Sequence, residues 1–198
     1  FDKMMEQPQN NPYHRYNVGV HSIEAVKNIR PDVTMRWAAL LHDVGKPATH
    51  SVDESGIDHF FDHPEKGVSI AESILRRLKF DNNTIKDVCA LVRWHDYGMG
   101  CVPKKGSIRK LLGEVGKDFF PYIIEIKKAD MAAQSDYNLE ERQIQLAALE
   151  EKYEEIMASD DCVRIKDLKI NGGDLIKMGI KPGPQMGEIL QKLLDMVM

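Results

Sequence analysis

Apolar residues recur every three or four positions along most of the chain, which is the spacing of one face of an α-helix. The pattern predicts helices over residues 17–29 and 32–45, a helix that starts near residue 63, and further helices over residues 83–95, 107–115, 119–135 and 139–157. Pro31 stops the first of these, and Gly45 followed by Pro47 ends the second. Residues 48–62 lack the pattern and predict a long loop. The chain is therefore predicted to be an all-α helical bundle.

The composition changes near residue 163 and predicts a separate tail. A short helix over residues 173–178 is followed by a turn rich in glycine and proline and by a final helix with its apolar residues on one side. We expect a main domain over residues 1–162, in which residues 1–16 form an extended lead-in, and a helix-turn-helix tail over residues 163–198. Lys181 lies in the turn, where free amides of the next helix can hold a phosphate, although a turn that serves a packed pair of helices explains it equally well. The family resemblance described below favours RNA binding at Lys181.

Ionisable side chains occupy several positions where the helical pattern calls for apolar ones. His21, His42, His95 and Asp130 each lie on the inward stripe of a different predicted helix. Burying such groups is costly unless a partner compensates them. A divalent metal ion is the simplest partner for all of them, and it would activate water for attack on a phosphate ester. The sequence therefore predicts a metal-dependent phosphohydrolase site.

The predicted ligands divide into two sets that share Asp43. The first ion is expected to bind His21, His42, Asp43 and Asp130, and a second ion would bind His63 and His95 with Asp43 as the bridge. Mixed nitrogen and oxygen ligands suit Mn, Fe, Ni, Co or Zn, and suit Mg less well. One ion remains an alternative, because His63 can instead cap its helix beside Pro64 and His95 can simply end one. His59 is a substitute candidate for His63.

Other residues near the predicted ligands are candidates for substrate contacts. We predict His42, Asp43 and Lys46 as the catalytic residues, with the Lys46 ammonium contacting a substrate phosphate. Arg109 follows two lysines and is a second candidate for phosphate binding, although a basic surface loop explains it nearly as well. Asp96 can orient a ligand histidine. The remaining histidines, His14 and His50, are expected to be ordinary hydrogen-bonded residues.

Charge and composition exclude several classes of protein. With 42% hydrophobic residues and 198 positions, the chain can bury one good core. Its formal net charge of −4 predicts no overall basic surface for nucleic acid. The three cysteines lack metal-site or disulfide spacing, and no apolar run approaches the roughly 18 residues of a membrane span, so we expect a cytoplasmic protein. The start at Phe1 suggests a fragment of a longer protein, and the oligomeric state stays open.

Two resemblances sharpen these expectations. The order of the predicted ligands and the run Ala38-Ala39-Leu40-Leu41-His42-Asp43-Val44-Gly45-Lys46-Pro47 resemble the HD superfamily of metal-dependent phosphohydrolases. Three further segments are similar to the HD-containing C-terminal portion of bacterial tRNA nucleotidyltransferases, the CCA-adding and poly(A) polymerase group. These segments are residues 9–14, 77–80 and 171–175.

The resemblance leaves two functional hypotheses. In that family an upstream domain with a Gly-Ser motif and paired carboxylates on a strand performs nucleotidyl transfer, and that combination is absent from this chain. The first hypothesis is an HD-type phosphohydrolase that acts on a nucleotide or cyclic phosphate ester, because the four core residues of the HD pattern are intact. The alternative is a noncatalytic module that positions tRNA for a CCA-adding enzyme and holds a structural metal ion.

Overall fold

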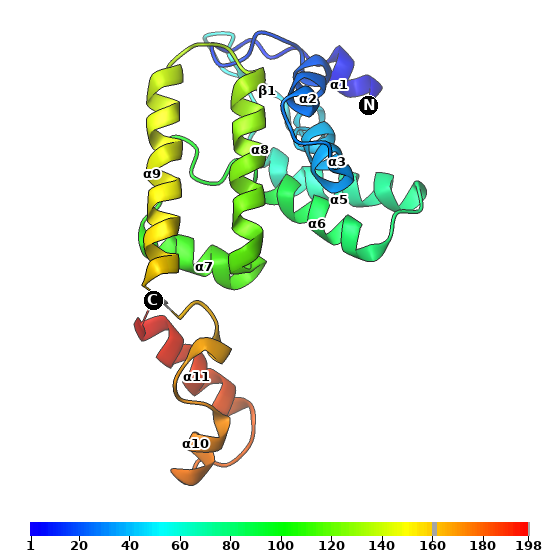
Figure 1. Cartoon of the computed structure of the whole chain (residues 1–198). Helices are drawn as coiled ribbons and strands as arrows, with labels where there is room; N and C mark the ends of the chain where they lie inside the picture. Colours follow the sequence, from blue (N-terminus) through cyan, green and yellow to red (C-terminus); the bar gives the residue numbers. More distant parts are fainter. Residues whose placement is uncertain (160–161, 198) are drawn as a thin grey trace. The chain divides into compact units, whose positions relative to one another are not determined.

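A computed structural model describes residues 1–159 and 162–197, so residues 160 and 161 of the predicted main domain and the last residue of the predicted tail lie outside it. The all-α prediction is confirmed (Figure 1). Beside the helices, the described residues hold one antiparallel pair of two-residue strands. The elements in chain order are α1 (Asp2–Glu6), α2 (Val18–Lys27), α3 (Val33–Leu41), α4 (Lys46–Thr49), β1 (Ser51–Val52), β2 (Asp58–His59), α5 (His63–Arg77), α6 (Asn82–Trp94), α7 (Lys105–Val115), η1 (Lys117–Phe119), α8 (Phe120–Ala133), α9 (Leu139–Ala158), η2 (Ile165–Asp167), α10 (Gly172–Lys177) and α11 (Pro184–Val197).

The chain forms two compact units. The first unit comprises residues 1–100 and 121–145, and the second comprises residues 101–120 and 146–198. The tail predicted from residue 163 therefore shares its unit with earlier parts of the chain, while the predicted domain boundary at that residue stays a prediction. None of the helices in the described part of the chain is long and apolar enough to cross a membrane.

Side-chain caps fix where several helices of the first unit begin. The Asn17 side chain accepts a hydrogen bond from the amide of Val20 at 2.8 Å, and Asp32 accepts one from Met35 at 3.0 Å. Such caps satisfy amides that have no partner inside the helix. Helix α5 begins at His63 with proline in its first turn, as the sequence predicts.

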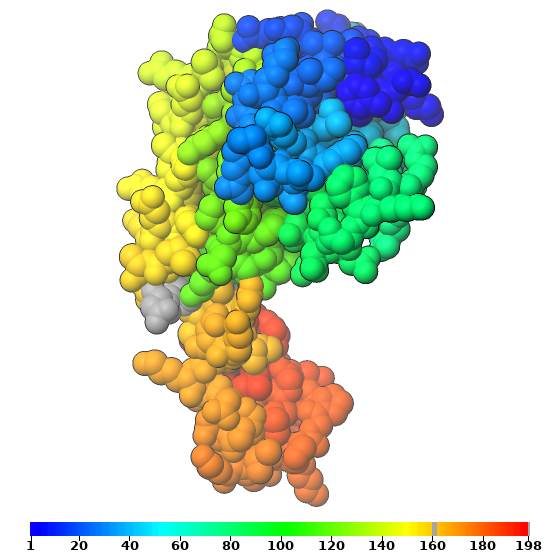
Figure 2. All heavy atoms as spheres, turned by 45° about the vertical axis from the view of Figure 1, so that its right-hand side comes forward, coloured from blue at the N-terminus to red at the C-terminus, as the bar shows by residue number. Residues whose placement is uncertain are grey.

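The core of the first unit is built from the predicted apolar stripes. Helix α5 packs against α6, and α3 packs against both α2 and α6. In Figure 2 the side chains of residues 1–100, coloured blue to green, form a closely packed body. Fully buried core residues include Val18, Ala25, Met35, Ala38, Ala39, Ala71, Leu75, Val88, Val92, Ile123 and Ile126.

The second unit has its own core. The ring of Phe120 stacks on that of Tyr153, with centroids 4.9 Å apart. Helix α10 contacts α11, and α11 contacts η2. Asn171 caps α10 and exchanges hydrogen bonds with Asp174 in a capping box. The buried residues of this unit include Ile108, Leu111, Leu112, Leu149, Ile156, Leu175, Leu190 and Leu194.

Three segments differ from the sequence prediction. A five-residue helix, α1, interrupts the lead-in that we expected to be extended, and its Met4 is buried. The expected loop over residues 48–62 contains the end of α4 and the β1–β2 pair. Helix α3 ends at Leu41 rather than at Gly45. The carbonyl of Ala39 accepts a 2.7 Å hydrogen bond from the ring of His42, which competes with the next helical hydrogen bond of that carbonyl.

Candidate metal centre

The adjacent pair His42 and Asp43 lies in a tight turn between α3 and α4. The turn is closed by hydrogen bonds between residues three apart, including the Lys46 amide to the Asp43 carbonyl at 3.0 Å. Gly45 allows the start of α5 to approach this turn closely. A Cβ atom at Gly45 would lie 2.1 Å from the carbonyl oxygen of His63, so a larger residue would push α5 away. Gly45 therefore allows His63 to lie close to the pair.

Four histidine rings are oriented in the same way. Each ring has its Nδ1 atom within hydrogen-bond distance of a backbone carbonyl, which makes Nδ1 the donor and leaves Nε2 as the free acceptor of the neutral ring. This arrangement is typical of histidines that bind metals through Nε2. The Nδ1 distances are His21 to Ala133 O, 3.4 Å; His42 to Ala39 O, 2.7 Å; His63 to Phe60 O, 2.8 Å; and His95 to Val92 O, 2.7 Å.

The first group of converging atoms comes from α2, the α3–α4 turn and α8. The Nε2 atoms of His21 and His42 are 3.2 Å apart. Asp130 Oδ1 lies 2.9 Å from the first and 3.6 Å from the second. All three residues are buried. Two ring nitrogens and a carboxylate oxygen within this distance form one of the groups that could hold a metal ion.

The second group comes from the same turn, the start of α5 and the end of α6. The Nε2 atoms of His63 and His95 are also 3.2 Å apart. Asp43 Oδ1 lies 3.2 Å from His63 and 3.6 Å from His95. Asp96 adds oxygens 3.3 Å from His63 and 3.4 Å from His95, so it is placed where it can supply a further ligand or orient the rings. His59 is not in this group: it pairs with Asp53 in the hairpin at 2.8 Å.

Asp43 joins the two groups through its two carboxylate oxygens. Its Oδ1 faces the second group, while its Oδ2 lies 3.2 Å from His42 Nε2 and 3.5 Å from His21 Nε2. Oδ2 is buried, and the Lys46 ammonium also lies near it, at 2.7 Å. Burying a carboxylate is costly unless positive charge compensates it. The two groups of ring nitrogens and carboxylate oxygens on either side of Asp43 are a donor set that fits divalent cations.

Electrostatics within the cluster strengthen this fit. Burial lowers the pKa of His42, but the charge of Asp43 and hydrogen bonds to Asp130 and Asp43 outweigh burial and raise that pKa to about 10. Burial raises the pKa values of both carboxylates, but other groups outweigh burial: the charges of His42 and Lys46 lower the pKa of Asp43, and hydrogen bonds from His21 and His42 lower that of Asp130, both to well below the usual range. The carboxylates therefore stay ionised and hold a proton on His42 when no other cation is bound. A metal ion would replace a positive charge that the site already attracts.

Lys46 is an internal cation of this cluster. Its side chain is buried, and its Nζ lies 2.7 Å from Asp43 Oδ2 and 2.7 Å from Gln9 Oε1. His14 Nε2 lies 3.4 Å from the same ammonium. An ammonium group has three hydrogens to donate, and these three neighbours match them. The predicted contact of Lys46 with substrate phosphate stays a prediction, and it would have to replace one of these neighbours.

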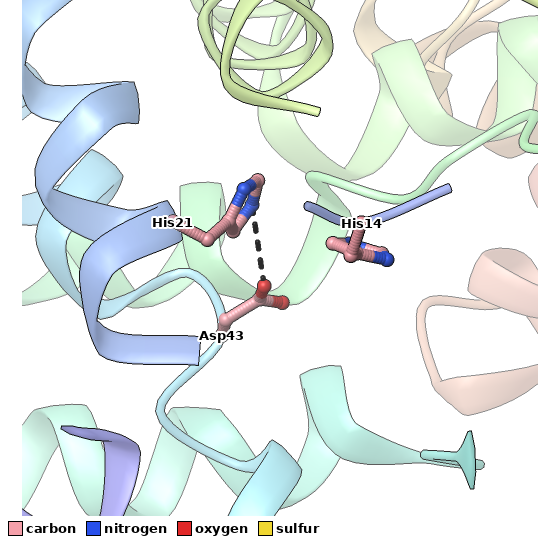
Figure 3. A group of neighbouring side chains, drawn as sticks. All are labelled: His14, His21 and Asp43. Atoms are coloured by element: carbon pink, nitrogen blue, oxygen red, sulfur yellow. Dashed lines mark ion pairs between the residues drawn. The ribbon is translucent and has the colours of Figure 1, made fainter. Parts of the chain in front are cut away.

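Sequence reasoning missed His14. Its ring faces His21 and Asp43, and the three residues have nitrogen and oxygen atoms within 4.8 Å of one another (Figure 3). Burial and the nearby Lys46 charge lower the pKa of His14 to about 3, so the ring is neutral. Its Nδ1 lies 2.9 Å from Asn11 Oδ1, which leaves Nε2 as the acceptor. The signal was present in the run Asn-Pro-Tyr-His, which carried a family resemblance, although it had no helical periodicity.

Further residues hold the ligands in place. The Gln134 amide donates to both oxygens of Asp130 at 3.2 and 3.1 Å, and Arg142 in turn donates to Gln134. Lys127 donates to the carbonyl oxygen of His95 at 3.2 Å. Partners of this kind orient metal ligands. Periodicity does not predict them, because each depends on contacts between different turns or helices.

The other predicted substrate residues lie in the second unit. Arg109 is on α7, and Lys181 is exposed in the turn between α10 and α11. Neither belongs to the histidine and aspartate cluster of the first unit, so their roles in phosphate and RNA binding stay predictions. All six predicted metal ligands, by contrast, are brought together.

The fold and the cluster define a class: an all-α protein with a buried histidine and carboxylate centre suited to divalent cations. Residues 67–198 match the family model for tRNA nucleotidyltransferase domain 2. The chain belongs to this tRNA nucleotidyltransferase family. No solved structure matches it.

Curated relatives agree with the family. The chain is 29% identical over 192 residues to the A-adding tRNA nucleotidyltransferase of Deinococcus radiodurans, covering 92% of this chain and 43% of the relative. It is 30% identical over 161 residues to the CC-adding tRNA nucleotidyltransferase of Thermus thermophilus, covering 81% and 35%. A multifunctional CCA protein of Actinobacillus pleuropneumoniae is 32% identical over 100 residues, covering 46% and 23%. The chain thus spans less than half the length of these relatives.

Proposed function

We propose that this chain is the helical, tRNA-binding portion of a tRNA nucleotidyltransferase. The observation that carries the proposal is the family match over residues 67–198, which includes the whole second unit. Two relatives aligned over most of the chain are named for adding A or CC to tRNA. We infer that the contribution of this portion is to hold and position tRNA.

Binding of tRNA tests this proposal directly. We expect the chain to bind deacylated tRNA more tightly than a DNA duplex of equal length, and to bind less tightly as salt rises, because phosphate contacts release counterions. Fluorescence anisotropy with labelled tRNA at several salt concentrations measures both effects. Equal affinity for tRNA and DNA, or no binding of tRNA at low salt, contradicts the proposal.

A second candidate function is metal-dependent phosphohydrolysis of the HD type. The observation that favours it is the convergence of four free Nε2 atoms on Asp43 and Asp130. His21, His42, Asp43 and Asp130 would hold one divalent ion, and the second group described above would hold another. A bound divalent cation lowers the pKa of water to about 7 and neutralises phosphate charge.

The residues of the chain would prepare this chemistry in distinct ways. Asp43 ties the two ligand groups together, and Lys46 holds its Oδ2 oxygen. Gln134 fixes the Asp130 carboxylate through both oxygens. In hydrolysis the oxygen of water would attack phosphorus, the bond to the leaving oxygen would break, and a proton would pass to that oxygen. The substrate class would be a nucleotide or a cyclic phosphate ester.

Metal content and turnover test the second candidate separately from tRNA binding. Protein purified without chelator should contain Mn, Fe, Ni, Co, Zn or Mg by elemental analysis, and the double variant H42A/D43A should lose that metal. Turnover of bis-p-nitrophenyl phosphate and of 2′,3′-cyclic nucleotides should disappear with it. The matched control is H59A, whose ring lies outside the cluster and should leave both readouts unchanged. Turnover that survives in H42A/D43A contradicts this candidate, and a metal-bearing but inactive protein assigns the ion a structural role.

A further inference from the structure

A hollow in the second unit is lined by cationic side chains from separate segments. It has a volume of about 490 Å³ and lies among α7, the segment over residues 163–166 and α11. Lys110 comes from α7, and Arg164 and Lys166 come from the 163–166 segment. Val163 and Leu194 contribute apolar side chains to its wall. The hollow is distinct from the histidine and aspartate cluster, all of whose members belong to the first unit.

The cations of this hollow lack the partners that other cations of the unit have. Lys105 pairs with Glu155 at 2.8 Å, whereas none of Lys110, Arg164 and Lys166 forms an ion pair with a residue that the structure describes. Asp195 is the acidic residue in the lining, and it accepts a hydrogen bond from the Gln191 side chain at 3.0 Å. Positive charge therefore exceeds negative charge in the lining, which favours an anion.

Arg164 is held in position without being neutralised. Its amide donates to Asp167 Oδ2 at 2.9 Å, and the amide of Val163 donates to the same oxygen at 3.2 Å, which fixes the backbone. The guanidinium lies against Gly116, where an added Cβ atom would come within 2.8 Å of Nη2. The backbone of Gly116 has a φ of 103°, which favours glycine, so the space beside the guanidinium is kept open. A prepositioned guanidinium loses less freedom on binding a ligand.

We propose that this hollow binds a phosphodiester group of the tRNA backbone through Lys110, Arg164 and Lys166. Arginine and lysine are the residues that bind phosphate oxygens of nucleic acids. The volume lies within the range of about 300–1,000 Å³ typical of ligand sites, which is room for a phosphate with its sugar. The apolar wall of Val163 and Leu194 suits the carbon face of a ribose. This inference rests on the proposed tRNA binding and places a contact at residues other than Lys181.

The test is tRNA binding by the variant K110A/R164A/K166A. We expect its affinity for tRNA to fall at least about tenfold at moderate salt. The slope of log affinity against log salt should become shallower by about 0.7–0.9, which is the contribution of one lost phosphate contact. The variant K110R/R164K/K166R retains the charges and should keep most of the affinity. The matched control K3A/K27A/K86A removes the same charge from exposed positions of the first unit and should change affinity less than about twofold.

The outcomes separate this proposal from the proposed function. If the unmodified chain does not bind tRNA, both fail. If it binds tRNA and the hollow variant binds equally well with an unchanged salt slope, only the hollow proposal is wrong. Equal losses of tRNA affinity in the hollow variant and in the control also overturn the proposal, because they show that net charge matters and the position of the charges does not. All three lysine and arginine positions are exposed or half-exposed, and circular dichroism checks that the variants fold.

Discussion

Replacing Asp43 by asparagine in the metal-free protein tests its buried contact with Lys46. The Lys46 side chain is buried, and Asp43, at 2.7 Å, is its anionic partner, while Gln9 and His14 are neutral acceptors. Removing one partner of a buried ion pair costs about 3–5 kcal/mol. At about 2–4 °C per kcal/mol for a chain of this size, we expect Tm to fall by about 6–20 °C.

A double-mutant cycle shows whether the loss comes from the orphaned ammonium. We expect D43N to cost more than K46M, because Asp43 keeps His42 and His63 as partners after the lysine is removed. The double variant D43N/K46M should cost less than the sum by about 1–3 kcal/mol, as for residues in contact. Urea and thermal unfolding are measured by circular dichroism in excess chelator. As a control, D53N removes an exposed pairing with His59 and should leave the free energy of unfolding nearly unchanged. Strict additivity of the two single variants would refute the reasoning.

The remaining predictions concern protons and the lead-in. Because the metal-free pKa of His42 is about 10, a metal ion must displace its proton, so metal affinity should rise about tenfold per pH unit below that value, with calorimetry in two buffers reporting proton release. Protonated His42 also stabilises the metal-free fold fully below about pH 6.5, and this stabilisation is lost as the pH rises through about 10. Unfolding measured as a function of pH should show this loss in the unmodified chain and not in H42A. Burial raises the pKa of Asp58, but hydrogen bonds, above all the one from His50, outweigh burial and lower that pKa below its ordinary value. Asp58 therefore stabilises the fold at pH values above the ordinary aspartate pKa, and this stabilisation is lost in acid. The variant D58N should flatten the acid limb of the same unfolding curve. Q9L removes an acceptor from Lys46 and should cost about 1–3 kcal/mol in urea unfolding, and a cost near zero would show that the contact is dispensable.

Helical periodicity predicted the parts of the molecule that depend on repeated local spacing. His95 and Asp130 were identified as ligand candidates because each continues an apolar stripe, and both side chains are buried against the cluster. The start of α5 at His63 was predicted from the proline that follows. Each of these features depends on the spacing of residues within one helix, and that spacing can be read from the sequence.

Features that depend on contacts between distant segments were not predictable in this way. Gln9 and His14 reach Lys46 from the lead-in, whose residues have no helical period. The end of α3 was misplaced because a side chain, His42 Nδ1, competes for a helical carbonyl. The hollow around Arg164 depends on the approach of α7 to a segment some fifty positions later in the chain, which no local pattern reports.

Family membership and the metal centre are independent observations on this chain. The family match covers residues 67–198 and leaves out His21, His42, Asp43 and His63, four of the six clustered residues. A protein could lose these four and still match the family model, so membership does not by itself require a metal ion. Conversely, the cluster lies in the first unit and the cationic hollow in the second. Substitutions in one should therefore leave the other intact: H42A/D43A should lose metal and keep the salt slope of tRNA binding, whereas K110A/R164A/K166A should keep metal and lose part of that slope. A shallower salt slope in H42A/D43A would show that tRNA binding requires the metal centre.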